Sequence, residues 1–288
     1  MDTHTESTSD AEHGKEKGCP FMRNKKLLAI LLVGVALRLF LVFTAAGINN
    51  DGFKYVSTAR QIANGGIMAG MEGDYFWPYF PVNRQLVFYP FLGSVVNCVV
   101  GDMVLSLRLV SALAGIGLIW LGYAISKELF DRETVALLAA GLLAIHPEFT
   151  EASAAVYREV LMAFLLMLSF LLFLWTIRGR EHWPRWAVVT GLTLFAAFMT
   201  RPDAAAAAAA MGLIALFVAP ELKWKKRLAI CTLMGLAFMA LEVPSILWMK
   251  QKTGYWMVTQ WQIEDKIPRP EAARRYLRGN EEGSHERD

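Results

Sequence analysis

Residues 27–51 read LLAILLVGVALRLFLVFTAAGINND, an apolar run of 20 residues followed closely by a carboxylate. A helix that crosses a bilayer needs about 20 mainly apolar residues, and residues 27–46 meet that length. The polar leader before the run lacks the short apolar core and the cleavage site of a signal peptide. The stretch therefore predicts a first membrane span that leaves Asp51 at the membrane surface.

The composition indicates the same class of protein for the rest of the chain. Of the 288 residues, 55% are hydrophobic and 19% are charged, and the mean hydropathy is +0.35. This apolar content is more than a soluble domain needs. The three cysteines, Cys19, Cys98 and Cys231, fall in different regions and predict no disulfide framework. We expect an all-α, polytopic integral membrane protein.

Apolar runs along the sequence predict about seven transmembrane helices. The runs 134–145 and 186–200 are short, because at 1.5 Å per residue they reach only about 18 and 22 Å. The stretch 86–100 is also apolar, but counting it as a span would move the later basic loops to the other side, so we place it at the membrane interface. The predicted spans are residues 27–46, 103–125, 134–145, 160–177, 186–200, 204–218 and 228–249.

Basic residues recur at every second loop and predict the orientation, because short cytoplasmic loops retain Lys and Arg. The amino terminus is expected inside and the carboxyl terminus outside, by default in a bacterial inner membrane. We divide the chain into a disordered cytoplasmic leader (1–24), a transmembrane module (25–250) with an outer loop at 47–102, and a partly disordered outer tail (251–288). The basic clusters are Arg23 with Lys25 and Lys26, Lys127 with Arg132, Arg178 with Arg180 and Arg185, and Lys223 with Lys225, Lys226 and Arg227.

The outer loop begins with a helical pattern that follows Asp51. Phe53, Val56, Ala59 and Ile62 or Ala63 fall on one face, and Gly65 with Gly66 should end the helix, which we expect to lie flat on the membrane. Asp51 can serve simply as the N-cap of this helix. The same position also suits a carboxylate that acts on a substrate, because capping keeps it ionised.

Other outer-side residues are candidates for binding, each with a simpler alternative. An aromatic stretch at residues 74–81 can stack on sugars, although interfacial belts are the commoner use of such rings. Lys54 and Arg84 can pair with phosphate or can be solvated charges. Arg158 and Glu159 open a predicted span as a structural pair or as catalytic residues, and Arg201 can reach a lipid phosphate.

Arg38 lies near the middle of the first span. A charge there costs about 2.5 to 3.5 kcal/mol on the translocon scale, so we expect it to face a partner or a water-filled cavity. Glu242 in the last predicted span is one candidate partner.

The order of these motifs resembles GT-C glycosyltransferases of the protein-mannosyltransferase and aminoarabinose-transferase type. The resemblance begins with Arg38 and Asn50-Asp51-Gly-Phe-Lys-Tyr55 and covers most of residues 25–260. It continues through Phe88-Tyr-Pro-Phe-Leu, Arg108-Leu-Val-Ser-Ala-Leu, His146-Pro, Glu159, Thr200-Arg-Pro-Asp, and Pro244 with Lys250 and Gly254.

The resemblance implies an inverting transferase that takes a polyprenyl-phosphate sugar and delivers the sugar to a lipid, glycan or protein acceptor. Asp51 would be the base or the acceptor-orienting carboxylate, with Glu159 as a second catalytic candidate. Lys54, Tyr55, Arg84, Arg158 and Arg201 would bind the substrate. Many relatives carry two adjacent acids where this chain has Asp51 and Gly52, so no metal ligand is assigned and a divalent metal cofactor stays open.

The residues support this chemistry without the family, because a displacement needs one carboxylate to take the acceptor proton and cations to stabilise the departing phosphate. The sequence shows no nucleotide-sugar motif, phosphate loop or zinc spacing, and no nucleic-acid partner is expected. Family members are usually longer, so an incomplete enzyme or a noncatalytic subunit is one alternative. A transporter or flippase component is another, in which Arg38, Glu242 and Pro202 mark a transport pathway.

Overall fold

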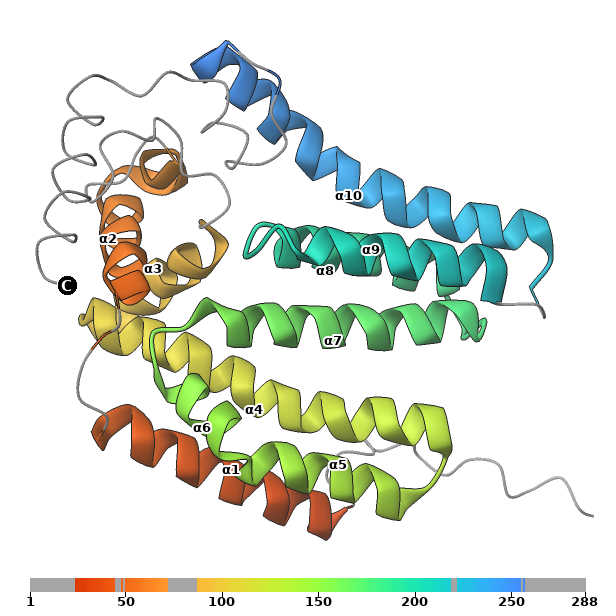
Figure 1. Cartoon of the computed structure of the whole chain (residues 1–288), viewed down its shortest axis with the longest axis horizontal. Helices are drawn as coiled ribbons and strands as arrows, with labels where there is room; N and C mark the ends of the chain where they lie inside the picture. The colour runs from red at the N-terminus through yellow and green to blue at the C-terminus, as the bar shows by residue number, and fades with distance from the viewer. Residues whose placement is uncertain are drawn as a thin grey trace, which may run out of the picture.

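The structure is a computed structural model that describes residues 24–44, 48, 50–71, 87–218, 222–254 and 256. Each described element is helical (Figure 1). The α-helices are α1 (Lys25–Thr44), α2 (Asn50–Met71), α3 (Phe88–Val100), α4 (Met103–Phe130), α5 (Glu133–Ile145), α6 (Pro147–Ala154), α7 (Arg158–Ile177), α8 (Trp183–Phe198), α9 (Ala204–Leu213) and α10 (Trp224–Thr253), and a π-helical turn, Ile214–Val218, follows α9.

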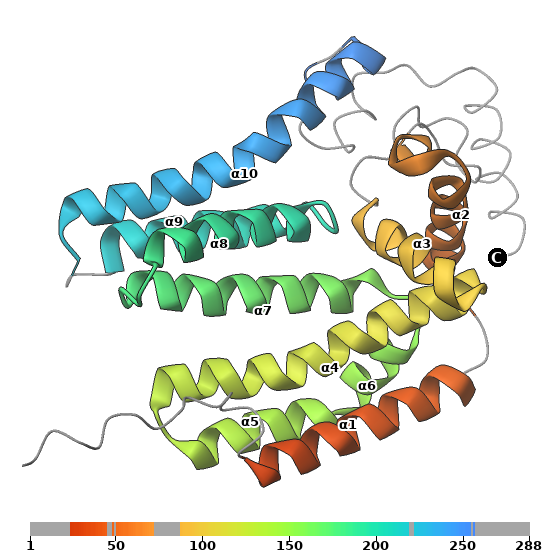
Figure 2. The ribbon, with the colours of Figure 1, turned by 180° about the vertical axis from the view of Figure 1, so that it is seen from behind.

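Helices α1, α4, α7 and α10 form a bundle, and α2 and α3 lie across one end of it. In both views the axes of α1, α4, α7 and α10 are roughly aligned, with α4 and α7 antiparallel to α1 and α10, whereas α2 and α3 lie beside the end where α7 begins (Figures 1 and 2). We call this the α2 end. The end of α1 and the link from α8 to α9 lie on the same side.

The all-α membrane class is confirmed, but the predicted count of seven spans is not. Among the described residues, α1, α4, α7 and α10 are long and apolar enough to cross a membrane. Helices α5 and α6 make a fifth candidate when taken together, bent by 56° at their junction. Helix α8 has 16 residues and α9 has 10, so each is shorter than the length that a spanning helix needs.

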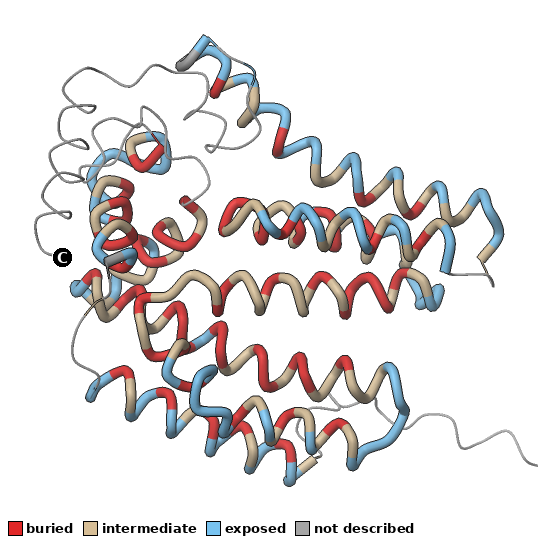
Figure 3. The backbone as a smooth tube through the Cα atoms, in the orientation of Figure 1, coloured by how far each residue is buried: buried red, intermediate tan, exposed pale blue. Residues whose placement is uncertain are grey.

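The core lies in the middle of the bundle, where helices are covered on several sides. Helices α4 and α7 carry several of the large, fully buried side chains, such as Leu107, Leu121 and Phe173, whereas α1 and α10 leave much of their surface uncovered (Figure 3). The uncovered residues are largely apolar, for example Phe40 and Phe43 on α1. This pattern is the one expected for outer helices that contact lipid.

Helix α2 follows the predicted pattern with two differences. Its buried face contains Val56, Ala59 and Ile62 as expected, but Tyr55 is buried beside them and Phe53 is 48% exposed. The helix also continues past the two glycines to Met71. It does so through a kink at Gly66, whose φ of 78° favours glycine.

The opposite end of the bundle gathers basic residues from loops that are far apart in sequence. Glu128, at the end of α4, forms ion pairs with Arg178 and Arg180 from the α7–α8 link. Lys226 of α10 lies 5.2 Å from the ring centre of Trp183 on α8. We call this the basic end. The shared position of these loops agrees with the predicted grouping of the basic clusters on one side.

Arg38 does not use the partner that the sequence suggested. Its side chain is 1% exposed, and its guanidinium donates hydrogen bonds to backbone carbonyls of α1 and α5. Glu242 belongs to α10, which lies on the opposite side of the molecule from α1 in both views (Figures 1 and 2). Among the described residues, the hydrogen-bond partners of the Arg38 guanidinium are therefore backbone carbonyls.

Candidate functional site

Asp51 lies in the first turn of α2, at the α2 end of the bundle. The helix begins at Asn50, so Asp51 is inside the helix rather than at the N-cap that the sequence allowed. Its side chain is 56% exposed, and its Oδ1 lies 3.1 Å from Nζ of Lys54. A carboxylate in a first turn is favoured by the helix dipole. Asp51 is thus an accessible carboxylate on an ordered helix.

Tyr55 lies one helical turn after Asp51 and faces the interior. Its ring meets the ring of Tyr89 edge to face, with 5.5 Å between centres. The guanidinium carbon of Arg158 lies 5.5 Å from the centre of the same ring. Tyr55 therefore connects α2 to the beginning of α7 through an aromatic contact and a cation–π contact.

Glu159 is the centre of a charged cluster at the beginning of α7. Its Oε1 lies 3.0 Å from Nη1 of Arg201 and 3.6 Å from Nε of Arg158. Arg201 also donates to Oδ2 of Asp203 at 2.6 Å, and Arg158 donates to the carbonyl of Thr200 at 3.4 Å. These contacts join α7 to the link between α8 and α9. We call Tyr55, Arg158, Glu159 and Arg201 the Glu159 cluster.

The cluster is partly shielded from solvent. Side-chain exposure is 15% for Arg158, 24% for Glu159 and 32% for Arg201. Glu159 Oε2 and Arg158 Nε are buried atoms that have no hydrogen-bond partner among the described residues. Buried polar atoms are usually paired, so two unpaired atoms in one cluster suit a place where a ligand binds.

The pKa values of two groups reflect these surroundings. Burial raises the pKa of Tyr55 well above its usual range. The charge of Arg158 lowers this pKa by a smaller amount, and the charge of Glu159 raises it. Burial alone would lower the pKa of Arg201, but the carboxylates of Asp203 and Glu159 outweigh it and raise that pKa. Tyr55 is therefore neutral and Arg201 cationic at neutral pH.

A buried hydrogen-bond network between α3, α4 and the residue before Arg158 lies next to the cluster. The hydroxyl of Tyr89 lies 2.9 Å from both the carbonyl of Leu107 and Oγ of Ser111. Ser111 in turn donates to the carbonyl of Tyr157 at 3.2 Å. This network fixes the chain immediately before Arg158 against α3 and α4.

The structure brings together some of the predicted site residues and leaves one undescribed. Tyr55, Arg158, Glu159 and Arg201 form one cluster, and Asp51 and Lys54 pair with each other one turn before it on α2. Arg84 and the aromatic residues 74–81 lie outside the described residues.

Sequence reasoning assigned no role to Tyr89, Ser111 or Asp203. Tyr89 and Ser111 were quoted only within motifs, and no charge pattern distinguishes them. Asp203 was visible two residues after Arg201 in the Thr200-Arg-Pro-Asp segment, a spacing that suits an ion pair across a turn.

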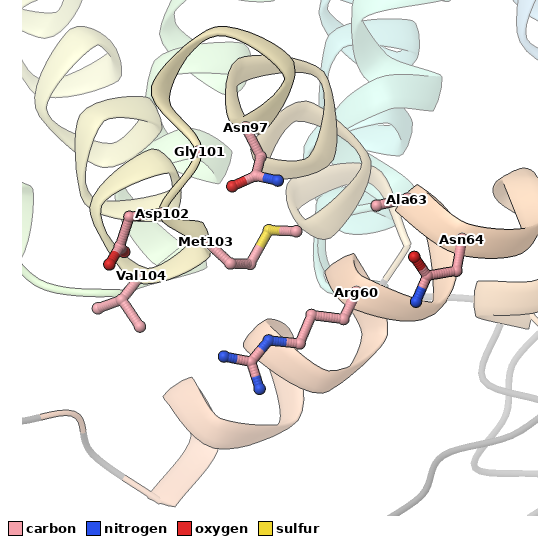
Figure 4. Close-up of a pocket in the computed structure, with 8 residues that line it drawn as sticks. All are labelled: Arg60, Ala63, Asn64, Asn97, Gly101, Asp102, Met103 and Val104. Atoms are coloured by element: carbon pink, nitrogen blue, oxygen red, sulfur yellow. The ribbon is translucent and has the colours of Figure 1, made fainter.

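The described part of the chain contains no group of three or more His, Cys, Asp or Glu side chains placed to hold a metal ion. A pocket of about 260 Å³ lies between α2 and the turn from α3 to α4 (Figure 4). Its lining residues are Arg60, Ala63, Asn64, Asn97, Gly101, Asp102, Met103 and Val104, and it includes none of the Glu159 cluster.

A solved structure shares this fold. The oligosaccharyltransferase of Archaeoglobus fulgidus, solved with a tethered acceptor peptide that contains the NVT sequon, matches with a TM-score of 0.52 at 17% sequence identity. The match covers 84% of this chain and 37% of the archaeal protein, so this chain aligns with little more than a third of that enzyme. No curated protein matches the chain at a significant level.

The profile of one protein family matches residues 86–248, which is more than half of the chain. The matched region extends from just before α3 into α10 and contains Arg158, Glu159 and Arg201. This match agrees with the resemblance found in the motifs and with the helical membrane fold. The chain belongs to the dolichyl-phosphate-mannose-protein mannosyltransferase family.

Proposed function

We propose that this protein transfers a sugar from a polyprenyl-phosphate donor to an acceptor at the outer face of the membrane. The observation that carries the proposal is the Glu159 cluster at the α2 end of the bundle, one helical turn from the accessible carboxylate of Asp51. The positive-inside rule supports the outer face, because the basic clusters lie at the opposite end.

The two arginines of the cluster suit the phosphate of the donor. Guanidinium groups bind phosphate through paired hydrogen bonds and keep their charge when partly buried. Arg201 is held by two carboxylates, and Arg158 is held by the ring of Tyr55 and by Glu159. Both cations are therefore preorganised to stabilise the negative charge that the leaving phosphate acquires.

Asp51 suits the acceptor side of the reaction. The acceptor oxygen attacks the anomeric carbon, the bond from that carbon to the phosphate oxygen breaks, and its electron pair leaves with the phosphate. Asp51 takes the proton of the acceptor or orients its hydroxyl, and a single displacement of this kind inverts the anomeric carbon. We assign the second oxygen of Glu159, which is buried without a hydrogen-bond partner among the described residues, to a hydrogen bond from the sugar once the donor is bound.

The test is transfer of radiolabelled sugar from a panel of polyprenyl-phosphate sugars to lipid, glycan and peptide acceptors, in membranes that contain the protein. Asp51→Asn should lower transfer by about 10²- to 10⁴-fold, the usual contribution of an acid–base group. Asp131→Asn is the matched control, because Asp131 is an exposed acid at the basic end, and it should retain transfer.

Two outcomes would contradict the proposal. Full transfer by Asp51→Asn would remove the base from the mechanism. No transfer from any donor by the unchanged protein would favour a noncatalytic subunit or a transport component, and Asp51 would then have only the structural role of an acid in a first helical turn.

A further inference from the structure

The junction between α5 and α6 leaves backbone carbonyls without their usual helical partners. In an uninterrupted helix the carbonyl of Leu143 would accept from the nitrogen of residue 147, but residue 147 is proline and has no N–H. Pro147 begins α6, and the chain bends by 56° at this point. The last turn of α5 therefore needs a donor from elsewhere.

Arg38 of α1 provides that donor. Its Nη2 donates to the carbonyl of Leu143 at 3.0 Å, and its Nη1 donates to the carbonyl of Ala144 at 3.2 Å. Nη1 also donates to the carbonyl of Gly34 in its own helix at 3.2 Å. One guanidinium thus serves the two carbonyls that precede the bend.

Two glycines make room for the guanidinium. A Cβ at Gly115 on α4 would lie 2.9 Å from Nε of Arg38 and would collide with the side chain of Ser153 on α6. A Cβ at Gly34 on α1 would collide with Ile119 and lie 3.4 Å from Nη1 of Arg38. The close approach of α1, α4 and α6 therefore depends on small residues around one large charged side chain.

Helix α6 leads directly to the Glu159 cluster. Ala154 at its end is buried with Ala112 of α4 and Val42 of α1. Three residues later, the carbonyl of Tyr157 accepts from Ser111, and Arg158 and Glu159 follow at once. The direction in which α6 leaves the bend thus determines where α7 begins.

We propose that Arg38 is a positioning residue that replaces the missing N–H of Pro147 and so fixes α6 and the beginning of α7. The consequence for transfer rests on the proposed function, whereas the consequence for the helix junction does not. The proposal is specific to hydrogen bonding. Pro147→Ala restores an N–H and frees His146, whose ψ is 121°, to become helical, so that this N–H can reach the carbonyl of Leu143 and make Arg38 less necessary.

The test is a double-mutant cycle with Arg38→Met, Pro147→Ala and the combination of both. The position of α6 is measured by oxidative cross-linking of cysteines introduced at Ala112 and Ala154, in a protein whose native cysteines are replaced. The apparent melting temperature in detergent is the second readout. Leu39→Met, a change at a partly exposed position of the same helix, is the control.

Arg38→Met should lower the cross-linking yield at least twofold and lower the melting temperature by about 3–8 °C, because it leaves two carbonyls unpaired. Adding Pro147→Ala should restore at least half of both losses, whereas Pro147→Ala alone should change little. Transfer per folded molecule should fall about tenfold in Arg38→Met and recover in the double variant. If Arg38→Met does not accumulate, the amount of folded protein becomes the readout, and Pro147→Ala must rescue it.

Equal defects in Arg38→Met and in the double variant would overturn the proposal, and so would normal cross-linking and melting in Arg38→Met. These two readouts need no sugar donor. If the Asp51→Asn experiment fails while the cycle shows rescue, only the proposed function is lost. If Asp51→Asn behaves as expected and the cycle shows no rescue, only the role of Arg38 is lost.

Discussion

The two ends of the bundle each contain a glutamate, two arginines and an aromatic ring, but they satisfy the glutamate differently. At the basic end both oxygens of Glu128 are partnered, by Arg178, by Arg180 and by the indole of Trp175. At the α2 end Glu159 uses only Oε1, and its Oε2 is buried without a hydrogen-bond partner among the described residues.

The arginines differ in the same sense. Arg178 and Arg180 are 45% and 50% exposed, so solvent can reach both guanidinium groups. Arg158 and Arg201 are 15% and 32% exposed. Both lie beside Glu159, whose Oε2 has no hydrogen-bond partner among the described residues. A completed cluster serves structure, whereas one that carries buried, unpaired polar atoms suits ligand binding. The two ends contain the same residue types, but the difference in hydrogen-bond pairing predicts a structural role for the basic end and a ligand-binding role for the α2 end.

The largest difference should be seen when one arginine is removed from each cluster. Arg201→Met should lower sugar transfer by about 10²- to 10³-fold, the cost of losing one preorganised donor to a developing negative charge. Arg180→Met should leave transfer per folded molecule nearly unchanged. Steady-state transfer measured on equal amounts of folded protein checks both. Similar losses in the two variants would mean that the clusters do not differ in function.

Replacing the two glutamates should give smaller effects, on sugar transfer for Glu159 and on stability for Glu128. Glu159→Gln should lower transfer by about 10- to 100-fold, because the amide no longer holds the arginines with a full charge. Glu128→Gln should instead lower stability by about 1 kcal/mol, since its arginine partners are half exposed. Transfer rates together with thermal unfolding distinguish the two, and a transfer defect confined to Glu128→Gln would reverse the assignment.

The aromatic partners should differ by a smaller factor. Tyr55→Leu removes the ring that lies against Arg158, a contact worth about 0.5 to 2 kcal/mol, so the KM for the donor should rise about 2- to 30-fold. Trp175→Leu, at the matching position beside Arg180, should leave KM unchanged. Tyr55→Phe keeps the ring and should behave like the unchanged protein. A raised KM in Tyr55→Phe would implicate the hydroxyl instead.

The smallest expected effect concerns pH. Burial raises the pKa of Tyr55, whereas a tyrosine in the unfolded chain ionises near pH 10. Above about pH 10 the unfolded state therefore loses a proton that the folded state keeps, and stability falls as pH rises. The melting temperature of the unchanged protein should fall more between pH 9 and 11 than that of Tyr55→Phe. Parallel curves would mean that Tyr55 also ionises when folded.

The sequence was a good guide to those features that depend on length and charge alone. The membrane class, the first span and the grouping of the basic loops follow from hydropathy and from the alternation of Lys and Arg. The helix that follows Asp51 follows from its periodicity. Arg158 and Glu159 were candidates because they open a predicted span, and Arg201 because it can reach a lipid phosphate at the outer face. The structure brings those three together.

Features that depend on packing were not predicted. The buried face of α2 includes Tyr55 and leaves out Phe53, because the register is set by contact with Tyr89 on another helix. Arg38 was expected to face a partner, with Glu242 as one candidate, or a water-filled cavity. Its hydrogen bonds to backbone carbonyls beside Pro147 could not be predicted from the positions of charged residues. The predicted count of seven spans is not confirmed, because α8 and α9 are shorter than a spanning helix and α6 bends away from α5.

Helix α10 has a length that relates the membrane to the site. Its 30 residues make it about 45 Å long, about 15 Å more than the hydrocarbon core of a bilayer. Beyond Pro244, Trp248 packs against the buried residues Ile62, Met71 and Val87, and Lys250 lies 3.9 Å from the ring centre of Trp256. If the amino-terminal part of α10 lies in lipid, its carboxyl-terminal part contacts α2 outside the hydrocarbon. The length of α10 then determines how far α2, and hence Asp51, lies from the hydrocarbon core. If the proposed function holds, the length of one helix then limits how closely Asp51 approaches a membrane-bound donor.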